Sequence, residues 1–204
     1  MLFNVIIFII ILVAILYCAN VIHKMKNDKK WNDKPIRNFK FKYHGKDFWY
    51  SRACTVTLFV FTKNSDGEWC VLANKRGDKV PDFKGHWNIP CGYIDFDESG
   101  EEAAQRECYE ETNVFIPLES IKFYSVYTNP SANKQNISLH YVSIFNEDLT
   151  NTFSLSDEHS ENGEVSEIQW VPISKINEYN WAFGHDILVN RLFMIFLREN
   201  PLFQ

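Results

Sequence analysis

The chain has 204 residues, a formal net charge of −5, and a composition that is 46% hydrophobic and 16% aromatic. So many apolar side chains can build a core, which excludes a broadly disordered chain. The acidic balance excludes a general nucleic-acid binder, because no excess of lysine and arginine exists to replace the counterions of a phosphate backbone.

The first predicted element is an apolar run from Leu2 to Ile22, which contains two asparagines and no charged residue. At about 1.5 Å per residue, a helix of this length spans roughly 31 Å, close to the hydrocarbon core of a bilayer. The run therefore predicts one transmembrane anchor over residues 1–23. A cleaved signal peptide, with a secreted product, is the competing interpretation. However, no basic residue precedes the run, and Tyr17-Cys18-Ala19 fits a cleavage site poorly.

A polar linker over residues 24–38 follows the apolar run. By the positive-inside rule, its basic side chains hold this flank in the cytoplasm, so we expect a single-pass membrane protein whose folded part is cytoplasmic. The basic residues are Lys24, Lys26, Lys29, Lys30, Lys34 and Arg37. About 165 residues then remain for one folded domain of ordinary size, predicted over residues 39–204.

The domain begins with predicted strands. Phe39, Phe41 and Tyr43 alternate with lysines, as on a half-buried strand. His44-Gly45 is typical of a turn into a second strand from Asp47 to Arg52, and this hairpin is a candidate contact for a homodimer. Further strands are predicted over Ala53–Thr62, Trp69–Lys75, Ile121–Tyr127, Ile137–Phe145 and Ile168–Val171.

Two helices complete the predicted domain. The first runs from Ser99 to Thr112, where Ser99 and Glu102 are spaced as a capping box, and the second runs from Gly184 to Arg198. The residues between the strand Trp69–Lys75 and the first helix are predicted to form a loop. The acidic segment 147–166 is predicted to form a mobile loop. Strands around one central helix, with a second helix at the end, favour an α/β/α sandwich with a mixed sheet.

Three carboxylates carry the first functional signal. Glu107, Glu110 and Glu111 are spaced i, i+3 and i+4, which places them on one face of the first helix. Like charges at this spacing destabilise a bare helix by a few tenths of a kcal/mol per pair. A divalent cation such as Mg²⁺ or Mn²⁺ would offset that repulsion. Three glutamates alone are more typical of a solvated helix face.

The surrounding residues decide between these interpretations. From Gly92 to Val114 the spacing is G-x5-E-x7-R-E-C-x-E-E-x-N-V. This stretch resembles the Nudix box, G-x5-E-x7-R-E-U-x-E-E-x-G-U, in which U is a bulky apolar residue. Asn113 replaces the last glycine, and Cys108 is a small residue at the first apolar position. Asparagine is the next-best residue for a left-handed helix cap, so we expect the turn to survive.

The resemblance extends beyond the box. Gly85 to Gly92 is similar to the G-x-W-x-L-P-G-G lead-in of Nudix proteins, and Glu167 to Pro172 is similar to their late E-x-x-W-V strand. In layout the similarity covers roughly residues 50–199. It implies a Nudix-like fold, preceded here by the predicted transmembrane helix.

The resemblance also implies a metal site. Glu107, Glu110 and Glu111 would bind one to three Mg²⁺ or Mn²⁺ ions, and the Gly92 carbonyl is an additional ligand in many members of the family. These donors are the hard oxygen ligands that both cations prefer.

Catalytic roles follow from the same resemblance. Glu98 and Arg106 would support the metal ligands, since the planar fork of Arg106 can bridge carboxylates. The general base would be Glu107 or a glutamate on a late loop, for which Glu164 and Glu167 are the candidates.

Other reactive side chains receive structural interpretations. The five cysteines lack C-x-x-C spacing and are predicted to be reduced thiols, with Cys91 and Cys108 buried. His86, His140 and His185 are not spaced as zinc ligands, and Trp87 is predicted to pack. Four cations precede the box and are candidate phosphate contacts, although most are predicted to face solvent: Lys75, Arg76, Lys79 and Lys84.

The implied activity is metal-dependent cleavage of a pyrophosphate bond in a nucleoside diphosphate linked to another moiety, such as a nucleotide sugar, a dinucleotide or a nucleoside triphosphate. One alternative is a catalytically inactive Nudix-fold module that binds a nucleotide or a protein partner, but this chain keeps every carboxylate of the box. A second alternative, a hydrolase of a lipid-linked diphosphate, is motivated by the predicted anchor. Specificity resides in loops, so the substrate stays open.

Overall fold

The structure is a computed structural model that describes residues 38–131, 133, 135–151 and 163–199. The anchor predicted over residues 1–23 lies outside the described residues, as does nearly all of the predicted linker. Within the described ranges, no helix is both long and apolar enough to cross a bilayer. The chain divides into two compact units, Met1–Ser51 and Arg52–Gln204.

The described part of the first unit is a two-stranded antiparallel hairpin. Strand β1 (Phe39–Tyr43) pairs with β2 (Lys46–Tyr50), which begins and ends earlier than the predicted second strand. His44 and Gly45 both have positive φ angles, of 46° and 77°. Two such residues between paired strands match the twist of the hairpin, which is why the turn forms at the predicted place.

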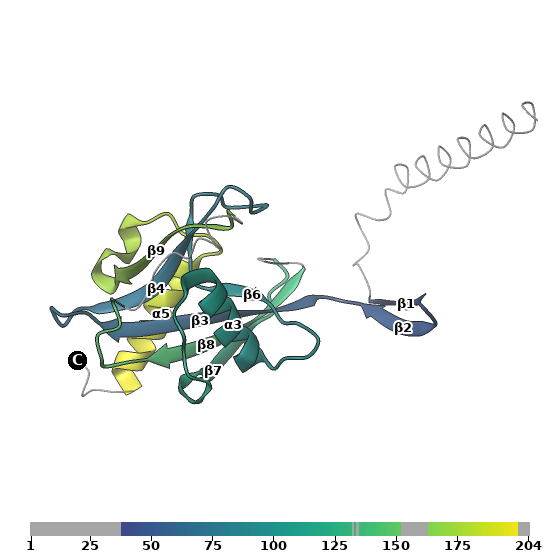
Figure 1. The fold of residues 1–204 in the computed structure, drawn as a ribbon, viewed down its shortest axis with the longest axis horizontal. Helices are drawn as coiled ribbons and strands as arrows, with labels where there is room; N and C mark the ends of the chain where they lie inside the picture. Colours follow the sequence, from purple (N-terminus) through teal and green to yellow (C-terminus); the bar gives the residue numbers. More distant parts are fainter. Residues whose placement is uncertain (1–37, 132, 134, 152–162, 200–204) are drawn as a thin grey trace, which may run out of the picture. The chain divides into compact units, whose positions relative to one another are not determined.

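The second unit is built on one mixed sheet. The strand order is β5-β4-β3-β8-β7, with β6 paired to β3 and β9 paired to β4 (Figure 1). The pairing of β3 with β8 is parallel, whereas the other described pairs are antiparallel. The strands are β3 (Ala53–Lys63), β4 (Trp69–Arg76), β5 (Trp87–Asn88), β6 (Cys91–Tyr93), β7 (Lys122–Tyr127), β8 (Asn136–Ile144) and β9 (Val165–Pro172).

Most of the predicted elements are present with ends shifted by a residue or two. Two exceptions are β5 and β6, which lie where the sequence predicts a loop, because strands of two and three residues are too short to show an alternating pattern. A third is β9, which begins at Val165, so its first residues belonged to the loop predicted over 147–166.

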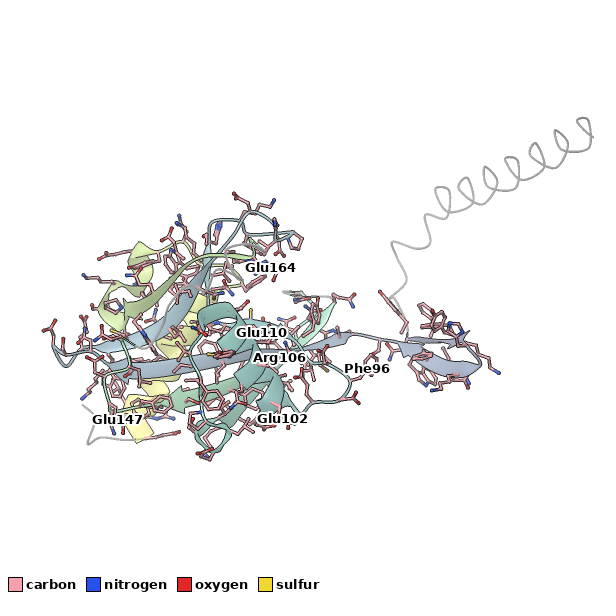
Figure 2. The ribbon with its side chains drawn as sticks, in the orientation of Figure 1. Phe96, Glu102, Arg106, Glu110, Glu147 and Glu164 are labelled. Carbon is pink, nitrogen blue, oxygen red and sulfur yellow. The ribbon has the colours of Figure 1, made fainter. Side chains whose placement is uncertain are left out.

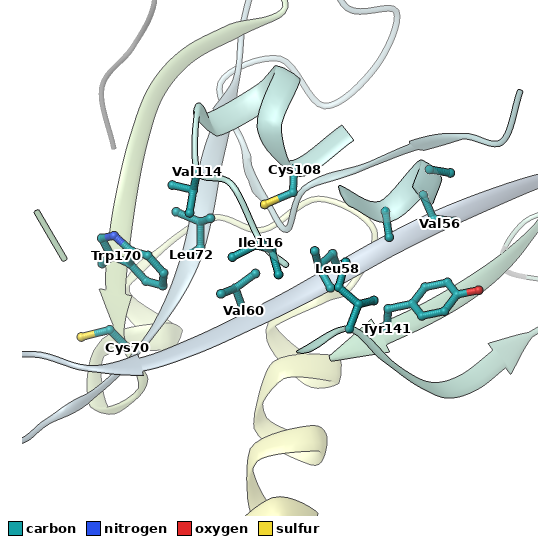
Figure 3. Packing of buried hydrophobic residues seen from close by; sticks show 13 residues of the cluster. Val56, Leu58, Val60, Cys70, Leu72, Cys108, Val114, Ile116, Tyr141 and Trp170 are labelled. Atoms are coloured by element: carbon teal, nitrogen blue, oxygen red, sulfur yellow. The ribbon is translucent and has the colours of Figure 1, made fainter. Parts of the chain in front are cut away.

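Helices cover both faces of the sheet, as an α/β/α sandwich requires. Helix α3 (Gly100–Thr112) packs on one face with Val56, Leu58 and Val60 of β3, and this cluster is drawn in Figure 3. Helix α5 (His185–Glu199) packs on the other face with Phe59 and Phe61 of the same strand. The two sets alternate along β3 because successive side chains of a strand point to opposite faces.

Short 3-10 turns connect these layers. They are η1 (Leu118–Ser120), between α3 and β7, and η2 (Ile173–Glu178), between β9 and α5. At the start of α3 the packing is tight, since a Cβ on Gly100 would lie 2.2 Å from the hydroxyl of Tyr141 on β8. This close approach fixes the height of α3 above the sheet and thereby the position of the acidic residues that it carries.

Candidate active site

Both ends of α3 are capped by local hydrogen bonds. The Ser99 hydroxyl accepts from the Glu102 amide at 3.2 Å, and the Glu102 carboxylate accepts from the Ser99 amide at 2.7 Å. These bonds are the predicted capping box. At the other end, Asn113 adopts the left-handed conformation with φ 57°, and its amide donates to the Tyr109 carbonyl. The Nudix-box turn therefore forms with asparagine in place of glycine.

The acidic face of α3 lies beside its buried face. Small buried residues, Ala103, Ala104 and Cys108, contact the sheet and bring the helix close to it. The neighbouring carboxylates differ in exposure: the Glu107 side chain is 15% exposed, whereas that of Glu110 is 54% exposed. Glu107 is therefore largely withdrawn from solvent, whereas Glu110 reaches into it.

Arg106 joins three carboxylates. Its guanidinium donates to Glu98 at 2.6 and 2.9 Å, to Glu107 at 2.8 Å and to Glu110 at 3.0 Å. Figure 2 labels Arg106 and Glu110 on α3. A fifth bond, to the Tyr93 carbonyl at 2.9 Å, ties the arginine to β6. The hydrogen bonds from Arg106 hold the pKa of Glu98 below its usual value. This fork fixes the orientation of the carboxylates before any ligand binds.

Glu111 occupies a different environment from Glu110. One carboxylate oxygen of Glu111 accepts from the Cys91 amide at 3.0 Å, at the start of β6. Burial, together with the nearby Glu107 carboxylate, raises the pKa of Glu111 to about 8. Burial also raises the pKa of Glu107, although the hydrogen bond from Arg106 opposes this shift. Two carboxylates thus share a poorly solvated region in which added positive charge would be stabilising.

Gly92 lies directly against the Glu107 carboxylate. A Cβ at this position would be 2.1 Å from the carboxylate carbon and from one of its oxygens, far inside van der Waals contact. Gly92 belongs to β6, where it pairs with Val56 of β3, so the sheet holds its backbone in place. Only glycine leaves room here for the carboxylate beside the main chain. The structure therefore brings together Gly92 and Glu107, which are 15 positions apart in the sequence.

The side chains are not arranged around a cation as they stand. Within the described part of the chain, no three His, Cys, Asp or Glu side chains converge closely enough to hold a metal ion. Two of the predicted ligands, Glu107 and Glu110, instead share Arg106 as their positive partner.

The two late candidates for the general base lie near the start of β9. Glu167 pairs with Lys75 across the strands, with the Nζ and Oε1 atoms 2.6 Å apart. Glu164 is exposed, precedes the strand, and accepts from the Gly77 amide through its backbone carbonyl at 2.7 Å (Figure 2). The hydrogen bonds described for these two residues run to β4 and its following loop, not to the Arg106 cluster.

Sequence reasoning missed Asn74, which contacts Glu111, and its cross-strand neighbour Asn88. Asn74 on β4 donates a side-chain hydrogen bond to Glu111, and it lies opposite Asn88 of β5 in the sheet register. Asn88 donates to the Ile89 carbonyl at 3.0 Å. The side-chain oxygens of both asparagines are buried, and neither accepts a hydrogen bond within the described ranges. The available signal was an asparagine inside the otherwise apolar strand 69–74.

Arg76 is the cation of β4 that is most withdrawn from solvent. Its side chain is 13% exposed, donates to the Asp82 carboxylate at 2.7 Å, and lies 5.0 Å from the centre of the Phe183 ring. Its charge counters the upward shift in the pKa of Glu111. Arg76 therefore adds positive potential on the sheet side of the acidic residues.

His140, His185 and Cys108 have the structural surroundings that the sequence predicts, whereas Cys91 is less buried than predicted. The buried His185 ring accepts from the Ile89 amide at 2.9 Å, and burial lowers its pKa to about 3. His140 is buried beside the Ser125 hydroxyl, and Trp87 is buried against Tyr179. The four described cysteines are free thiols, of which Cys108 is fully buried and Cys91 is partly buried.

Comparisons with known proteins agree with this architecture. The family model of the NUDIX domain matches residues 53–192. The Nudix domain of NrtR from Shewanella oneidensis, solved in complex with ADP ribose, is 23% identical, with a TM-score of 0.59 over 72% of this chain and 90% of that one. A MutT/Nudix family protein from Listeria innocua is 25% identical, with a TM-score of 0.58 over 75% and 99% of the two chains.

A third solved structure is longer than this chain. It is the bifunctional NMN adenylyltransferase/ADP ribose pyrophosphatase of Francisella tularensis, complexed with AMP and a manganese ion. The identity is 19% and the TM-score 0.55, over 89% of this chain and 47% of that one. The family match over residues 53–192, together with the sheet, the two covering helices and the box on α3, shows that this chain belongs to the Nudix hydrolase superfamily and is a hydrolase of phosphoric anhydrides.

Proposed function

We propose that the protein is a Mg²⁺- or Mn²⁺-dependent pyrophosphohydrolase that cleaves a nucleoside diphosphate linked to another moiety. One observation carries this proposal: the Glu107 carboxylate lies against the backbone of Gly92 with no room for a side chain between them. Such an approach leaves a carboxylate beside the main chain of β6, which is where a carbonyl and a carboxylate can serve one cation together.

The surrounding charges support a cation at this place. Glu107 and Glu111 are both poorly solvated, and burial raises the pKa of each, so the deprotonated pair lacks sufficient compensating charge. Glu110 lies on the same face of α3, and its side chain is half exposed. Carboxylate oxygens are the donors that hard divalent cations prefer, so this set of residues fits Mg²⁺ or Mn²⁺.

The solved relatives support the class of substrate. The NrtR domain was solved in complex with ADP ribose, and the bifunctional enzyme was solved in complex with AMP and a manganese ion. For this chain we therefore propose a substrate in which a nucleoside is joined through a diphosphate to a second group.

Each site residue has a proposed task. When bound, the cation supplies an acidified water and neutralises the charge that grows on the bridging oxygen. Glu107, Glu110 and Glu111, with the Gly92 carbonyl, hold the cation. Arg106 keeps Glu98, Glu107 and Glu110 oriented through its hydrogen bonds to their carboxylates, so that these side chains need little reorganisation when the substrate binds.

The general base is one of three glutamates. Glu107 lies against Gly92, whereas Glu164 and Glu167 lie near the beginning of β9. The carboxylate of Glu167 is held by Lys75 at 2.6 Å, so Glu164 is the better of the two late candidates to take the proton of the attacking water.

The proposed location follows from the sequence of the first 38 residues. We propose that residues 1–23 anchor the protein in a membrane and that the basic residues after them keep the Nudix domain on the cytoplasmic side.

A substrate panel tests the proposed activity. The full chain in detergent is incubated with Mg²⁺ or Mn²⁺ and with ADP-ribose, NADH, diadenosine polyphosphates, nucleoside triphosphates or capped RNA, and products are separated by chromatography. We expect cleavage of at least one diphosphate and none after chelation. Ligand binding without turnover on any substrate would favour the inactive binding module.

Replacing one ligand tests the proposed site. Because Glu110 is half exposed and amide oxygens still accept from Arg106, Glu110→Gln should leave the fold intact. We expect turnover to fall about a thousandfold, the equivalent of several kcal/mol of lost charge stabilisation, and manganese affinity to weaken in a direct titration. The matched control is Glu119→Gln, an exposed glutamate of η1. Equal activity of the two variants would refute the assignment.

A further inference from the structure

The hairpin of β1 and β2 has one aromatic face. The register pairs Phe39 with Tyr50 and Phe41 with Phe48, so all four rings lie on the same side of the two strands, together with Tyr43. Ring centres of the first pair are 4.9 Å apart and those of the second pair are 5.7 Å apart, and both pairs are stacked. Phe39 is 52% exposed and Phe41 45% exposed.

The opposite face of the hairpin is polar and basic. It carries Lys40 opposite Trp49 and Lys42 opposite Asp47, and Lys40 forms an ion pair with Asp47 at 3.1 Å. Lys46 lies opposite Tyr43 on the aromatic face, at the turn, so the polar face itself carries two lysines against one aspartate. The hairpin is thus amphipathic, with stacked rings on one side and excess positive charge on the other.

The size of the aromatic face limits what can cover it. A two-stranded hairpin alone is at best marginally stable in water. Five residues per strand give a face of roughly 10 by 17 Å, about 170 Å², whereas a stable dimer buries about 800 Å² on each partner. A second copy on this face alone would therefore bury too little surface.

The sequence before the hairpin indicates which cover is within reach. Only 16 residues separate Ile22, the end of the apolar run, from Phe39, and an extended chain of that length spans at most about 55 Å. The intervening residues include the six basic side chains of the linker, which anionic lipid headgroups attract. A bilayer that holds the apolar run therefore lies within reach of the hairpin.

We propose that the hairpin over residues 39–50 binds the interface of an anionic lipid bilayer. Its aromatic face enters the boundary between headgroups and acyl chains, where aromatic rings are favoured, and its lysines lie at the level of the lipid phosphates. This proposal rests on the proposed membrane location, and it adds a second contact beyond the anchor.

Fluorescence quenching tests the proposal in the full chain. Trp31→Phe and Trp49→Phe remove the tryptophans near the membrane, and Phe41→Trp then places a reporter on the aromatic face. The control reporter is Phe123→Trp, at a 56% exposed aromatic position on β7. In phosphatidylcholine/phosphatidylglycerol vesicles with brominated acyl chains, we expect quenching of the first reporter and not of the second.

The outcomes separate the hairpin from the anchor. A chain that floats with the vesicles while the reporter at residue 41 stays unquenched overturns the proposal and leaves the anchor in place. A blue-shifted but unquenched reporter also overturns it, because protein, such as a second copy, would then cover the rings. Quenching at low salt in a chain released at high salt supports the hairpin and refutes the anchor. A chain that never binds refutes both.

The lipid charge gives an independent check. Lys42→Gln should weaken the hairpin's partitioning into phosphatidylglycerol-containing vesicles about fivefold, as expected for one lysine near an anionic surface. Quenching in pure phosphatidylcholine should be the same with and without this substitution. Equal partitioning of both chains into the anionic vesicles contradicts the proposed position of the lysines.

Discussion

The two helices that cover the sheet are held by different forces. Helix α5 buries Val189, Leu192 and Phe193 in an aromatic cluster, whereas α3 buries two alanines, Cys108 and Thr112. Helix α3 buries less side-chain volume, and it is stabilised in addition by a capping box, a left-handed asparagine cap and the hydrogen bonds of Arg106.

The different packing of the two helices gives them different roles: α5 contributes mainly to stability, whereas α3 carries the residues of the candidate site. Burial of large side chains fixes α5 on the sheet. Small residues let α3 approach the sheet so closely that Glu107 meets the backbone of Gly92. We therefore expect substitutions behind α5 to change the free energy of unfolding, and substitutions at the β6 face of α3 to change turnover.

The largest effect on this comparison should come from Phe193→Ala. The ring packs on Phe61 and Trp69, with ring centres 5.7 and 5.8 Å away, so its removal leaves a cavity. We expect a loss of about 3–5 kcal/mol in the free energy of unfolding, measured by urea denaturation, with turnover per folded molecule unchanged. Met194→Ala, at a 65% exposed neighbour on the same helix, should change stability by less than about 0.5 kcal/mol. A loss of turnover per folded molecule in Phe193→Ala would contradict the expectation that residues behind α5 affect stability alone.

Gly92→Ala should show the opposite behaviour. The new Cβ displaces the Glu107 carboxylate, and a misplacement of about 1 Å in a catalytic group can cost roughly a hundredfold in rate. We expect that loss in turnover, together with weaker manganese binding. Combining it with Glu107→Asp, which shortens the side chain, should recover the stability lost to the clash but not the activity. Full activity in Gly92→Ala would show that the close approach has no catalytic role.

The smallest expected effect is a pH dependence of stability in the chelated protein. Because the pKa of Glu111 is raised to about 8 in the folded state, the folded chain retains a proton that the unfolded chain releases near pH 4.5. This group's contribution is therefore fully present below pH 4.5 and is lost as the pH rises toward 8. Since solvent still reaches part of Glu111, we expect a loss of about 1–2 kcal/mol.

Urea titrations at several pH values check this sign. Glu111→Gln should remove the decline, and added Mn²⁺ should reverse it, because a cation favours the deprotonated carboxylate. A stability that rises between pH 5 and pH 8, traceable to Glu111 by the same variant, would contradict the buried environment of this residue.

Local sequence determined the long strands, both helices and the chemical character of α3. Hydrophobic alternation predicted the long strands, Ser99 and Glu102 predicted the start of the helix, and Asn113 predicted its end, because each depends on residues a few positions apart. The spacing of Glu107, Glu110 and Glu111 likewise placed them on one face. The box resemblance supplied the superfamily.

Only the tertiary structure decided how these carboxylates differ. The spacing is the same whether or not Glu111 is buried beside Asn74, and nothing local shows that Gly92 will meet Glu107. These contacts join β4, β6 and α3, so they depend on strand register and on the height of the helix above the sheet. Charges and periodicities can be counted along the chain, but burial is a property of the assembled layers, and burial is what distinguishes a site from a charged surface.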